Sequence, residues 1–262
     1  MSDNAEDGQT KREVILRASQ VTVGFGRKII LENLDLTVYR GEILGFVGGS
    51  GTGKSVLMRA ILGLVPMQSG SVEVFGIELG GLSEADRTEL DQRWGVLFQH
   101  GALFSALTVL QNIQVPMREH LALSEQLMNE LALLKLALVG LPRDAAGKFP
   151  SELSGGMIKR AGLARALALD PEIVFLDEPT SGLDPISAAA FDNLIMKLRE
   201  TLGLTVYMVT HDLDSLHKAC DRIAVLGDGK VLVEGTLEKL LNYQHPWVQE
   251  YFCGERSLRL NA

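Results

Sequence analysis

A glycine-rich run that ends in lysine and serine has the residue types and spacing of a phosphate-binding loop. Residues 48–55 read GGSGTGKS and fit the pattern G-x-x-x-x-G-K-[ST]. Glycines let backbone N–H groups turn inward around phosphate oxygens. Lys54 is spaced to reach the β- and γ-phosphates, and the Ser55 hydroxyl is a suitable ligand for Mg²⁺. The predicted nucleotide-binding residues are Gly48, Gly49, Ser50, Gly51, Thr52, Gly53, Lys54, Ser55 and Val56.

A glycine-rich turn that binds nothing is the structural alternative for this run. The apolar stretch EILGFV precedes the run, and the helix-like VLMRAILGL follows it. A strand, a loop and a helix therefore occur in the order that phosphate binding requires, and the helix adds the positive end of its dipole. We favour the binding site.

Two acidic residues follow a second apolar stretch, IVFL, at positions 177 and 178. A carboxylate at the end of a parallel strand lies at the sheet edge where ligands bind. We predict that Asp177 holds Mg²⁺, through water, and that Glu178 accepts a proton from an attacking water or orients it. The alternative is an acidic cap on a buried strand, which the phosphate loop upstream makes less attractive.

Three further side chains carry a weaker signal when each is taken alone. His211 ends the apolar stretch YMVTH, so it should project from the same sheet edge, near the γ-phosphate or the attacking water. Gln99 follows the strand-like WGVLF and, alone, would be interpreted as a surface residue. Phe25, in VTVGF, would be interpreted as a core residue rather than as a ring that stacks on adenine.

The elements that must position these side chains indicate an α/β fold. The first third of the chain is strand-rich, with the short runs VILRA, VTVGF, LDLTVY and EILGFVG. A helix-prone segment follows, from about residue 105 to 168. Apolar strands then alternate with helical patterns, which is typical of parallel strands covered on both faces. We expect a nucleotide-binding core with an antiparallel β region before it and a helical insertion within it.

Composition excludes several classes of protein. The chain has 262 residues and a formal net charge of −8, which argues against nucleic acid as a partner. It lacks the run of ~20 apolar residues that a membrane span needs, so we expect no direct membrane insertion. Its two cysteines fit a reducing cytosol. Residues 1–12 are polar and acidic and are predicted to be a disordered lead-in.

One more motif places a glycine pair in front of a good helical pattern. The segment SELSGGMIKRAGLARAL covers residues 151–167, and a glycine pair disfavours helix formation. Together with the other motifs, in this order, the segment makes the chain resemble the ATP-binding subunits of ABC transporters. The resemblance covers about residues 14–241, and we assign residues 13–241 to one ABC ATPase domain. It rests on Phe25, GGSGTGKS, Gln99, LSGGM, IVFLDE, SGLD and His211.

The resemblance implies a P-loop NTPase, RecA-like core, and an ATPase whose site needs two copies of the chain. Ser154 would offer its hydroxyl, and Gly155 and Gly156 their N–H groups, to the γ-phosphate held by a second copy. Asp184 is carried over as a further nucleotide-site residue. ATP with Mg²⁺ would join the copies, and hydrolysis would separate them.

The same resemblance assigns the remaining roles. Phe25 would stack on the adenine ring. The implied catalytic residues are Lys54, Gln99, Glu178 and His211. The implied Mg²⁺ ligands are Ser55, Gln99 and Asp177.

Three details resemble the ATPase subunits of the bacterial Mla phospholipid transport system and related MCE-linked transporters. These are the segment 97–120, Met157 in LSGGM, and the tail segment 242–254. The resemblance implies a cytoplasmic, peripheral position on the bacterial inner membrane, and as partners a permease, an MCE-domain protein and a small STAS-type subunit. It also implies phospholipid movement between inner and outer membrane.

Alternatives remain open at this point. The cargo could be another small solute, the protein could be a soluble ABC ATPase that acts on ribosomes or DNA, or it could be a non-hydrolysing switch. Residues 242–262 are predicted to be an extension that docks on a neighbouring subunit, and the alternative is a terminal helix packed on its own core.

Overall fold

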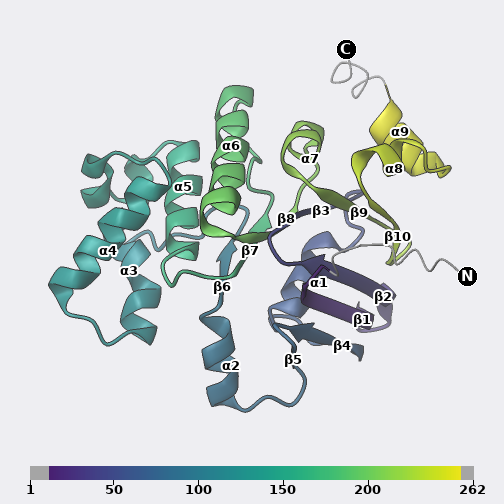
Figure 1. Cartoon of the computed structure of the whole chain (residues 1–262), viewed down its shortest axis with the longest axis horizontal. Helices are drawn as coiled ribbons and strands as arrows, with labels where there is room; N and C mark the ends of the chain where they lie inside the picture. Colours follow the sequence, from purple (N-terminus) through teal and green to yellow (C-terminus); the bar gives the residue numbers. More distant parts are fainter. Residues whose placement is uncertain (1–11, 255–262) are drawn as a thin grey trace, which may run out of the picture.

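The computed structural model describes residues 12–254, and a six-stranded sheet forms its centre (Figure 1). The strand order is β10-β9-β3-β8-β7-β6. The pairs that involve β3, β6, β7 and β8 are parallel, whereas β10 runs antiparallel to β9. The strands are β3 (Ile43–Gly48), β6 (Trp94–Leu97), β7 (Ile173–Asp177), β8 (Thr205–Val209), β9 (Arg222–Gly227) and β10 (Lys230–Gly235).

The central strands are buried along their whole length, as their continuous apolar sequences predict. Every residue of β3, β7 and β8 is buried. One apolar cluster covers one face of the sheet, and a second covers the other face. Polar side chains that follow these strands are therefore pushed to the carboxyl edge of the sheet, where loops are open to ligands.

A second, antiparallel sheet confirms the expected β region. Its order is β2-β1-β4-β5, with β1 (Val14–Phe25), β2 (Lys28–Tyr39), β4 (Ser69–Val74) and β5 (Ile77–Glu78). The runs VILRA and VTVGF, predicted as two short strands, form the single strand β1. Gln20 takes a positive φ of 50°, and the register with β2 shifts between Ala18 and Val21, so an irregularity replaces the expected break.

The predicted helical insertion forms a separate group of helices. Figure 1 shows α3, α4 and α5 at one end of the molecule and the antiparallel sheet at the other. The group contains α3 (Val109–His120), α4 (Glu125–Leu138), the 3₁₀ turns at Arg143–Gly147 and Pro150–Glu152, and α5 (Gly155–Ala166). A capping box at Thr108 and Gln111 begins α3, and the Ser154 side chain caps α5.

The remaining helices flank the sheets. They are α1 (Lys54–Ile61), α2 (Glu84–Asp91), α6 (Pro185–Leu202), α7 (Leu213–Ala219), α8 (Leu237–Leu241) and α9 (Pro246–Cys253). Across residues 12–254, no helix combines the length and apolar character that a membrane crossing requires.

The described part of the tail packs on the core of its own chain. Val248 and Phe252 of α9 are fully buried, in a cluster with Val47 and Val225 of the central sheet. This is the arrangement that a terminal helix packed on its own core requires, and docking on another subunit stays a prediction. Residues 1–11 of the expected lead-in, and residues 255–262 of the tail, lie outside the described residues.

Candidate functional site

The phosphate loop connects the end of β3 to the start of α1, as its sequence predicts. Gly53, just before α1, has a φ of 110°, and a Cβ atom there would lie 2.7 Å from a methyl group of Ile30. Glycine is therefore required by both backbone and space. Gly51 also has a positive φ, of 76°. The Thr52 hydroxyl donates a hydrogen bond of 2.9 Å to the Gly49 carbonyl, which tightens the turn.

Lys54 lies across the same loop. Its ammonium group donates hydrogen bonds to the carbonyl oxygens of Gly48 and Gly49, at 2.9 and 3.0 Å. Burial lowers the pKa of Lys54, and the carboxylates of Glu178 and Asp177 oppose this shift. The Lys54 ammonium group is therefore held at the phosphate loop, near the carboxylates of Asp177 and Glu178.

Ser55 and Asp177 join the phosphate loop to the end of β7. The Ser55 hydroxyl donates to Asp177 Oδ1 at 3.0 Å, although the two residues are far apart in the sequence. Asp177 is only 3% exposed. A hydroxyl and a carboxylate are hard oxygen donors, which suit Mg²⁺ when phosphate oxygens and water complete the coordination.

Glu178 and His211 form a direct pair at the neighbouring strand ends. His211 Nδ1 lies 2.6 Å from Glu178 Oε2. The Glu178 side chain is 12% exposed and that of His211 is 64% exposed, so the pair runs from the protein interior to the surface. Glu178 has a φ of 50°, and its N–H donates to the carbonyl of Val209 at 2.8 Å. A side chain at a strained backbone position beside a phosphate loop is typical of a functional site.

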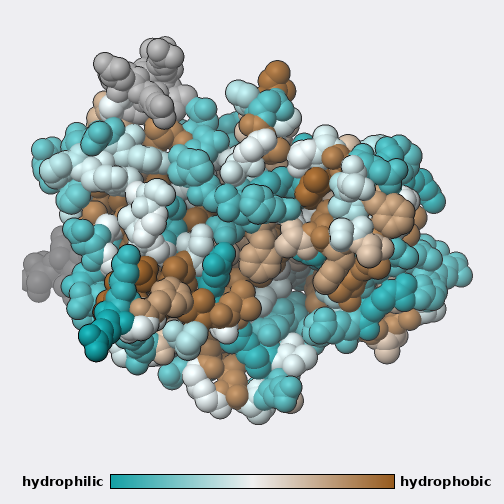
Figure 2. Space-filling view, turned by 180° about the vertical axis from the view of Figure 1, so that it is seen from behind, coloured by the Kyte–Doolittle hydropathy of each residue, from teal (hydrophilic) through white to brown (hydrophobic). Residues whose placement is uncertain are grey.

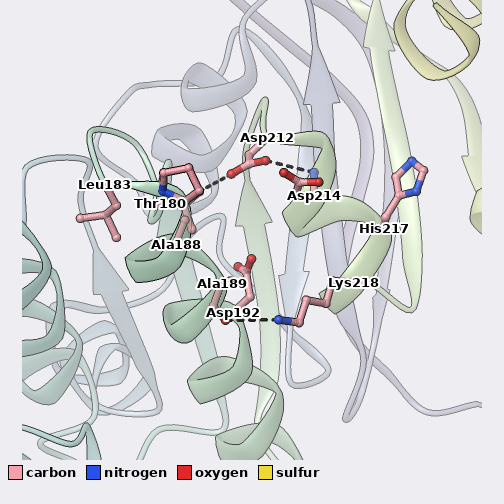
Figure 3. Close-up of a pocket in the computed structure, with 10 residues that line it drawn as sticks. Thr180, Leu183, Ala188, Ala189, Asp192, Asp212, Asp214, His217 and Lys218 are labelled. Carbon is pink, nitrogen blue, oxygen red and sulfur yellow. Dashed lines mark hydrogen bonds between the residues drawn. The ribbon is translucent and has the colours of Figure 1, made fainter. Parts of the chain in front are cut away.

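A network of polar side chains connects the loop that carries Glu178 to the loop that carries His211. The Thr180 hydroxyl donates to Asp212 Oδ2 at 3.3 Å, and Asp212 caps α7 (Figure 3). Deeper in, the Ser215 hydroxyl donates to Asp192 at 2.9 Å. Burial raises the pKa of Asp192 to about 6. These contacts fix the loop after Glu178 against the loop of His211.

The network borders a cavity of about 470 Å³ between α6 and α7. Figure 3 shows Asp192 and Lys218 on facing helices, with Asp212 and Thr180 at the other end of the cavity. The lining residues are Thr180, Leu183, Pro185, Ala188, Ala189, Asp192, Asp212, Asp214, His217 and Lys218.

Lys159 of α5 is a site residue that sequence reasoning missed. Its buried ammonium group donates to the backbone carbonyl of Gln99, and also to that of Glu178 at 2.9 Å. Burial lowers its pKa, while Glu178 and Asp177 raise it. Every residue type has a backbone carbonyl, so the sequence does not mark the acceptors of this lysine. The one signal for its buried role is a lysine on an apolar face of the helix. The side chain of Gln99 itself is exposed.

The remaining predicted residues lie at element ends. Ser154 caps α5, and Gly155 and Gly156 are its first residues; among residues 12–254, no side chain closes the space over Gly156. Figure 1 shows α5 in the helical group, apart from α1, so one chain does not bring Ser154 to its own phosphate loop. Phe25 is 55% exposed at the end of β1, so its interpretation as a core residue is wrong.

Two predicted residues have local structural contacts. Asp184 accepts hydrogen bonds of 3.0 Å from the N–H groups of Ile186 and Ser187 at the start of α6, and bonds with Ser187 lower its pKa. Val56 is half-buried in α1 against an apolar cluster. Their nucleotide contacts stay predictions.

Comparisons with known proteins agree with this geometry. Residues 31–181 match the family model described as ABC transporter. The chain is 41% identical over 241 residues to the intermembrane phospholipid transport system ATP-binding protein MlaF of Haemophilus influenzae, covering 92% of this chain and 91% of that protein. It is 39% identical over 240 residues to a methionine import ATP-binding protein, MetN, of Carboxydothermus hydrogenoformans, covering 91% of this chain and 71% of the relative.

A solved structure shares the fold. A dimeric ATP-binding cassette in a post-hydrolysis state, bound to ADP and Pi, superimposes with a TM-score of 0.77 and 32% sequence identity. The match covers 84% of this chain and 98% of the chain in the solved structure. The predicted fold class is therefore confirmed. The chain belongs to the ABC transporter family and is an ATPase cassette of that family.

Proposed function

We propose that this cassette is the ATP-hydrolysing subunit of a transporter that moves phospholipids between the inner and outer membranes and so maintains outer-membrane lipid asymmetry. The observation that carries ATP hydrolysis is the Glu178–His211 pair, 2.6 Å apart beside the phosphate loop. The cargo rests on the similarity to MlaF proteins, at 41% identity in Haemophilus influenzae and 38% in Escherichia coli.

The nucleotide would extend from the exposed ring of Phe25 to the end of β7. Phe25 would stack on the adenine, and the loop residues 48–55 would surround the phosphates. Ser55 and Asp177, already 3.0 Å apart, fit Mg²⁺ by donor type, and the exposed Gln99 can complete the set. The bound ion would neutralise charge on the phosphate oxygens.

The residues of this chain divide the chemistry between them. Glu178 accepts a proton from the attacking water as that water bonds to the γ-phosphorus, and the bond to the bridging oxygen of ADP breaks. His211 holds the Glu178 carboxylate and faces the γ-phosphate. Lys54 stabilises the charge that develops on the phosphate oxygens.

A second copy of the chain would complete each site. Ser154, Gly155 and Gly156 sit at the open start of α5, where a helix N-terminus favours an anion. The exposed Asp184 lies at the start of α6. The similar cassette bound to ADP and Pi is dimeric, which supports this arrangement.

The permease would dock beside Gln99, at an apolar groove of about 400 Å³ that includes Phe98, Phe104, Val115 and Pro116. Phe104 is 54% exposed there. Figure 2 shows apolar surface on both halves of the molecule, including the half that carries the helical group. The further partners would be an MCE-domain protein and a STAS-type subunit. The cassette would then lie peripherally on the cytoplasmic face of a bacterial inner membrane.

The second candidate cargo is another small solute, as in methionine import. The MetN relative is 39% identical, so identity alone does not separate the two cargoes. The Mla-like segment 97–120 borders the groove proposed for the permease, and this placement favours the phospholipid system.

The test is to purify the complex from membranes, identify its partners and bound lipid, and measure phosphate release. An MCE-domain partner with bound phospholipid would support the proposal. A periplasmic solute-binding partner would contradict the cargo but not the ATPase. Absence of hydrolysis in the intact complex would contradict the ATPase itself.

A further inference from the structure

Helix α9 carries three aromatic side chains, Trp247, Tyr251 and Phe252, that have no part in the proposed chemistry. Trp247 and Tyr251 lie one turn apart, and their rings stack with centroids 4.8 Å apart and an interplanar angle of 14°. Figure 1 shows α9 with α8, β9 and β10 at the C-terminal end of the described chain. A stacked aromatic pair on a helix that is anchored on its neighbouring face forms a stiff unit.

The anchoring side of α9 reaches both loops of the ATP site. Val248 and Phe252 share an apolar cluster with Val47 of β3 and Leu216 of α7. Val47 directly precedes the phosphate loop, and α7 begins two residues after His211. Gln249 further fixes the helix, since its side chain donates to the carbonyls of Leu241 and Tyr243 at 3.0 and 2.7 Å.

Tyr251 contacts the loop that carries His211. Its hydroxyl donates a hydrogen bond of 2.8 Å to the His211 carbonyl oxygen. Burial raises the pKa of Tyr251, and the nearby carboxylates of Glu178 and Asp212 raise it further, so the phenol stays a donor. Because the carbonyl and the imidazole belong to one residue, the bond limits rotation of the backbone that aims the imidazole at Glu178.

Trp247 lies next to the phosphate loop. A Cβ atom at Gly49 would lie 3.7 Å from Trp247 Nε1 and 3.3 Å from the Thr52 methyl group. The indole edge therefore lies next to the loop, on the side of Gly49 where a side chain would stand. The stacked pair adjoins the phosphate loop through one ring and is bonded to the His211 loop through the other.

We propose that α9 braces the ATP site from within the same chain, with Tyr251 as a positioning residue for His211 and Trp247 as a support for the phosphate loop. The proposal rests on the proposed role of His211 in hydrolysis. It gives the C-terminal segment a task in catalysis that needs no neighbouring subunit.

The central test is Tyr251→Phe in the assembled transporter, because this change removes one hydroxyl and keeps the ring stack. We expect kcat for ATP hydrolysis to fall about three- to tenfold, while KM for ATP changes by less than about twofold. The lost bond acts on a residue that meets the transition state, whereas the phosphate loop keeps its contacts. A purely structural role would lower Tm without this split between kcat and KM.

Tyr243→Phe is the matched control. Tyr243 lies in the same C-terminal segment, and its hydroxyl donates a bond of 3.1 Å to the Leu232 carbonyl, away from the ATP site. We expect kcat and KM of this variant to equal those of the wild type. If both variants have the same kinetic constants, Tyr251 does not position His211.

Fluorescence tests the proposed support of the phosphate loop by Trp247 without requiring hydrolysis. The sequence has two tryptophans, so Trp94→Phe leaves Trp247 as the single emitter. Mg-ATP, added to this variant with Glu178→Gln to prevent turnover, should change the emission of Trp247. Unchanged emission at a nucleotide concentration that saturates binding would overturn the proposed support of the phosphate loop by Trp247. A wild-type complex that binds but does not hydrolyse ATP would instead contradict the proposed function.

Discussion

Glu178→Gln removes one negative charge from the proposed site and keeps the size of the side chain. Glu178 Oε2 lies 2.6 Å from His211 Nδ1, and an amide oxygen can occupy the same place. The glutamine amide does not accept a proton from water. We therefore expect the variant to bind ATP normally, to lose hydrolysis and to accumulate as an ATP-bound dimer.

The magnitude follows from how the carboxylate is surrounded. The Glu178 side chain is 12% exposed, and the neighbouring Asp177 is already bonded to Ser55 at 3.0 Å, so neither bulk water nor Asp177 replaces the base well. A positioned general base contributes about 10²- to 10⁴-fold to a rate. We expect kcat to fall about 10²- to 10³-fold, which is ~3–4 kcal/mol of activation free energy.

The assay combines phosphate release under saturating Mg-ATP with equilibrium ATP binding and size-exclusion chromatography. Glu172→Gln is a matched control at the other end of the same strand, where Glu172 pairs with Arg40 at 2.7 Å and Arg93 at 2.6 Å. That variant should lose a little stability and keep its kcat. Turnover of Glu178→Gln close to the wild-type value would refute the assignment of Glu178 as the base.

Three further substitutions test stability, pH dependence and the phosphate loop. Tyr207→Phe should raise the free energy of unfolding by ~1 kcal/mol in denaturant titrations, because the buried Tyr207 hydroxyl has no hydrogen-bond partner within residues 12–254. Burial raises the pKa of Asp192 to about 6, above its unfolded value, so the stability that its protonated form contributes is lost as pH rises toward 6. The Tm of Asp192→Asn relative to wild type should therefore increase from pH ~4 to pH ~7, and a constant difference would contradict this. Gly53→Ala should weaken equilibrium ATP binding far more than Gly51→Ala, because a Cβ atom at Gly53 would lie 2.7 Å from Ile30, whereas the space at Gly51 is open as far as residues 12–254 are concerned. Equal binding by the two variants would count against the steric argument.

The sheet edge and its acids could be predicted from the sequence because the signal is local. Continuous apolar runs predicted β7 and β8 as buried parallel strands, and polar residues follow each run directly. Asp177 of β7 pairs in register with Val209 of β8, so the residues that follow the two strands lie side by side at the sheet edge. The contact between Glu178 and His211 is a consequence of that register.

Contacts to backbone carbonyls could not be predicted in this way. Tyr251 donates to a carbonyl that lies 40 positions away, and Lys159 donates to one that lies 60 positions away. Any residue type offers the same acceptor, so no pattern in the sequence marks these partners. The exposure of Phe25 could not be predicted from the residue taken alone, because an aromatic residue in a strand pattern is more often buried than not; only the family resemblance implied an accessible ring.

The Lys159 ammonium has a consequence for building chimeras between cassettes. One side chain on α5 donates to the carbonyls of both Gln99 and Glu178. When the helical group of one relative replaces that of another, the side chain at position 159 comes from the donor protein, whereas the carbonyls at positions 99 and 178 come from the recipient protein. A graft that ends with a side chain too short to reach both carbonyls would leave the loops of Gln99 and Glu178 misaligned, so junctions should be chosen to move Lys159 and Gln99 together.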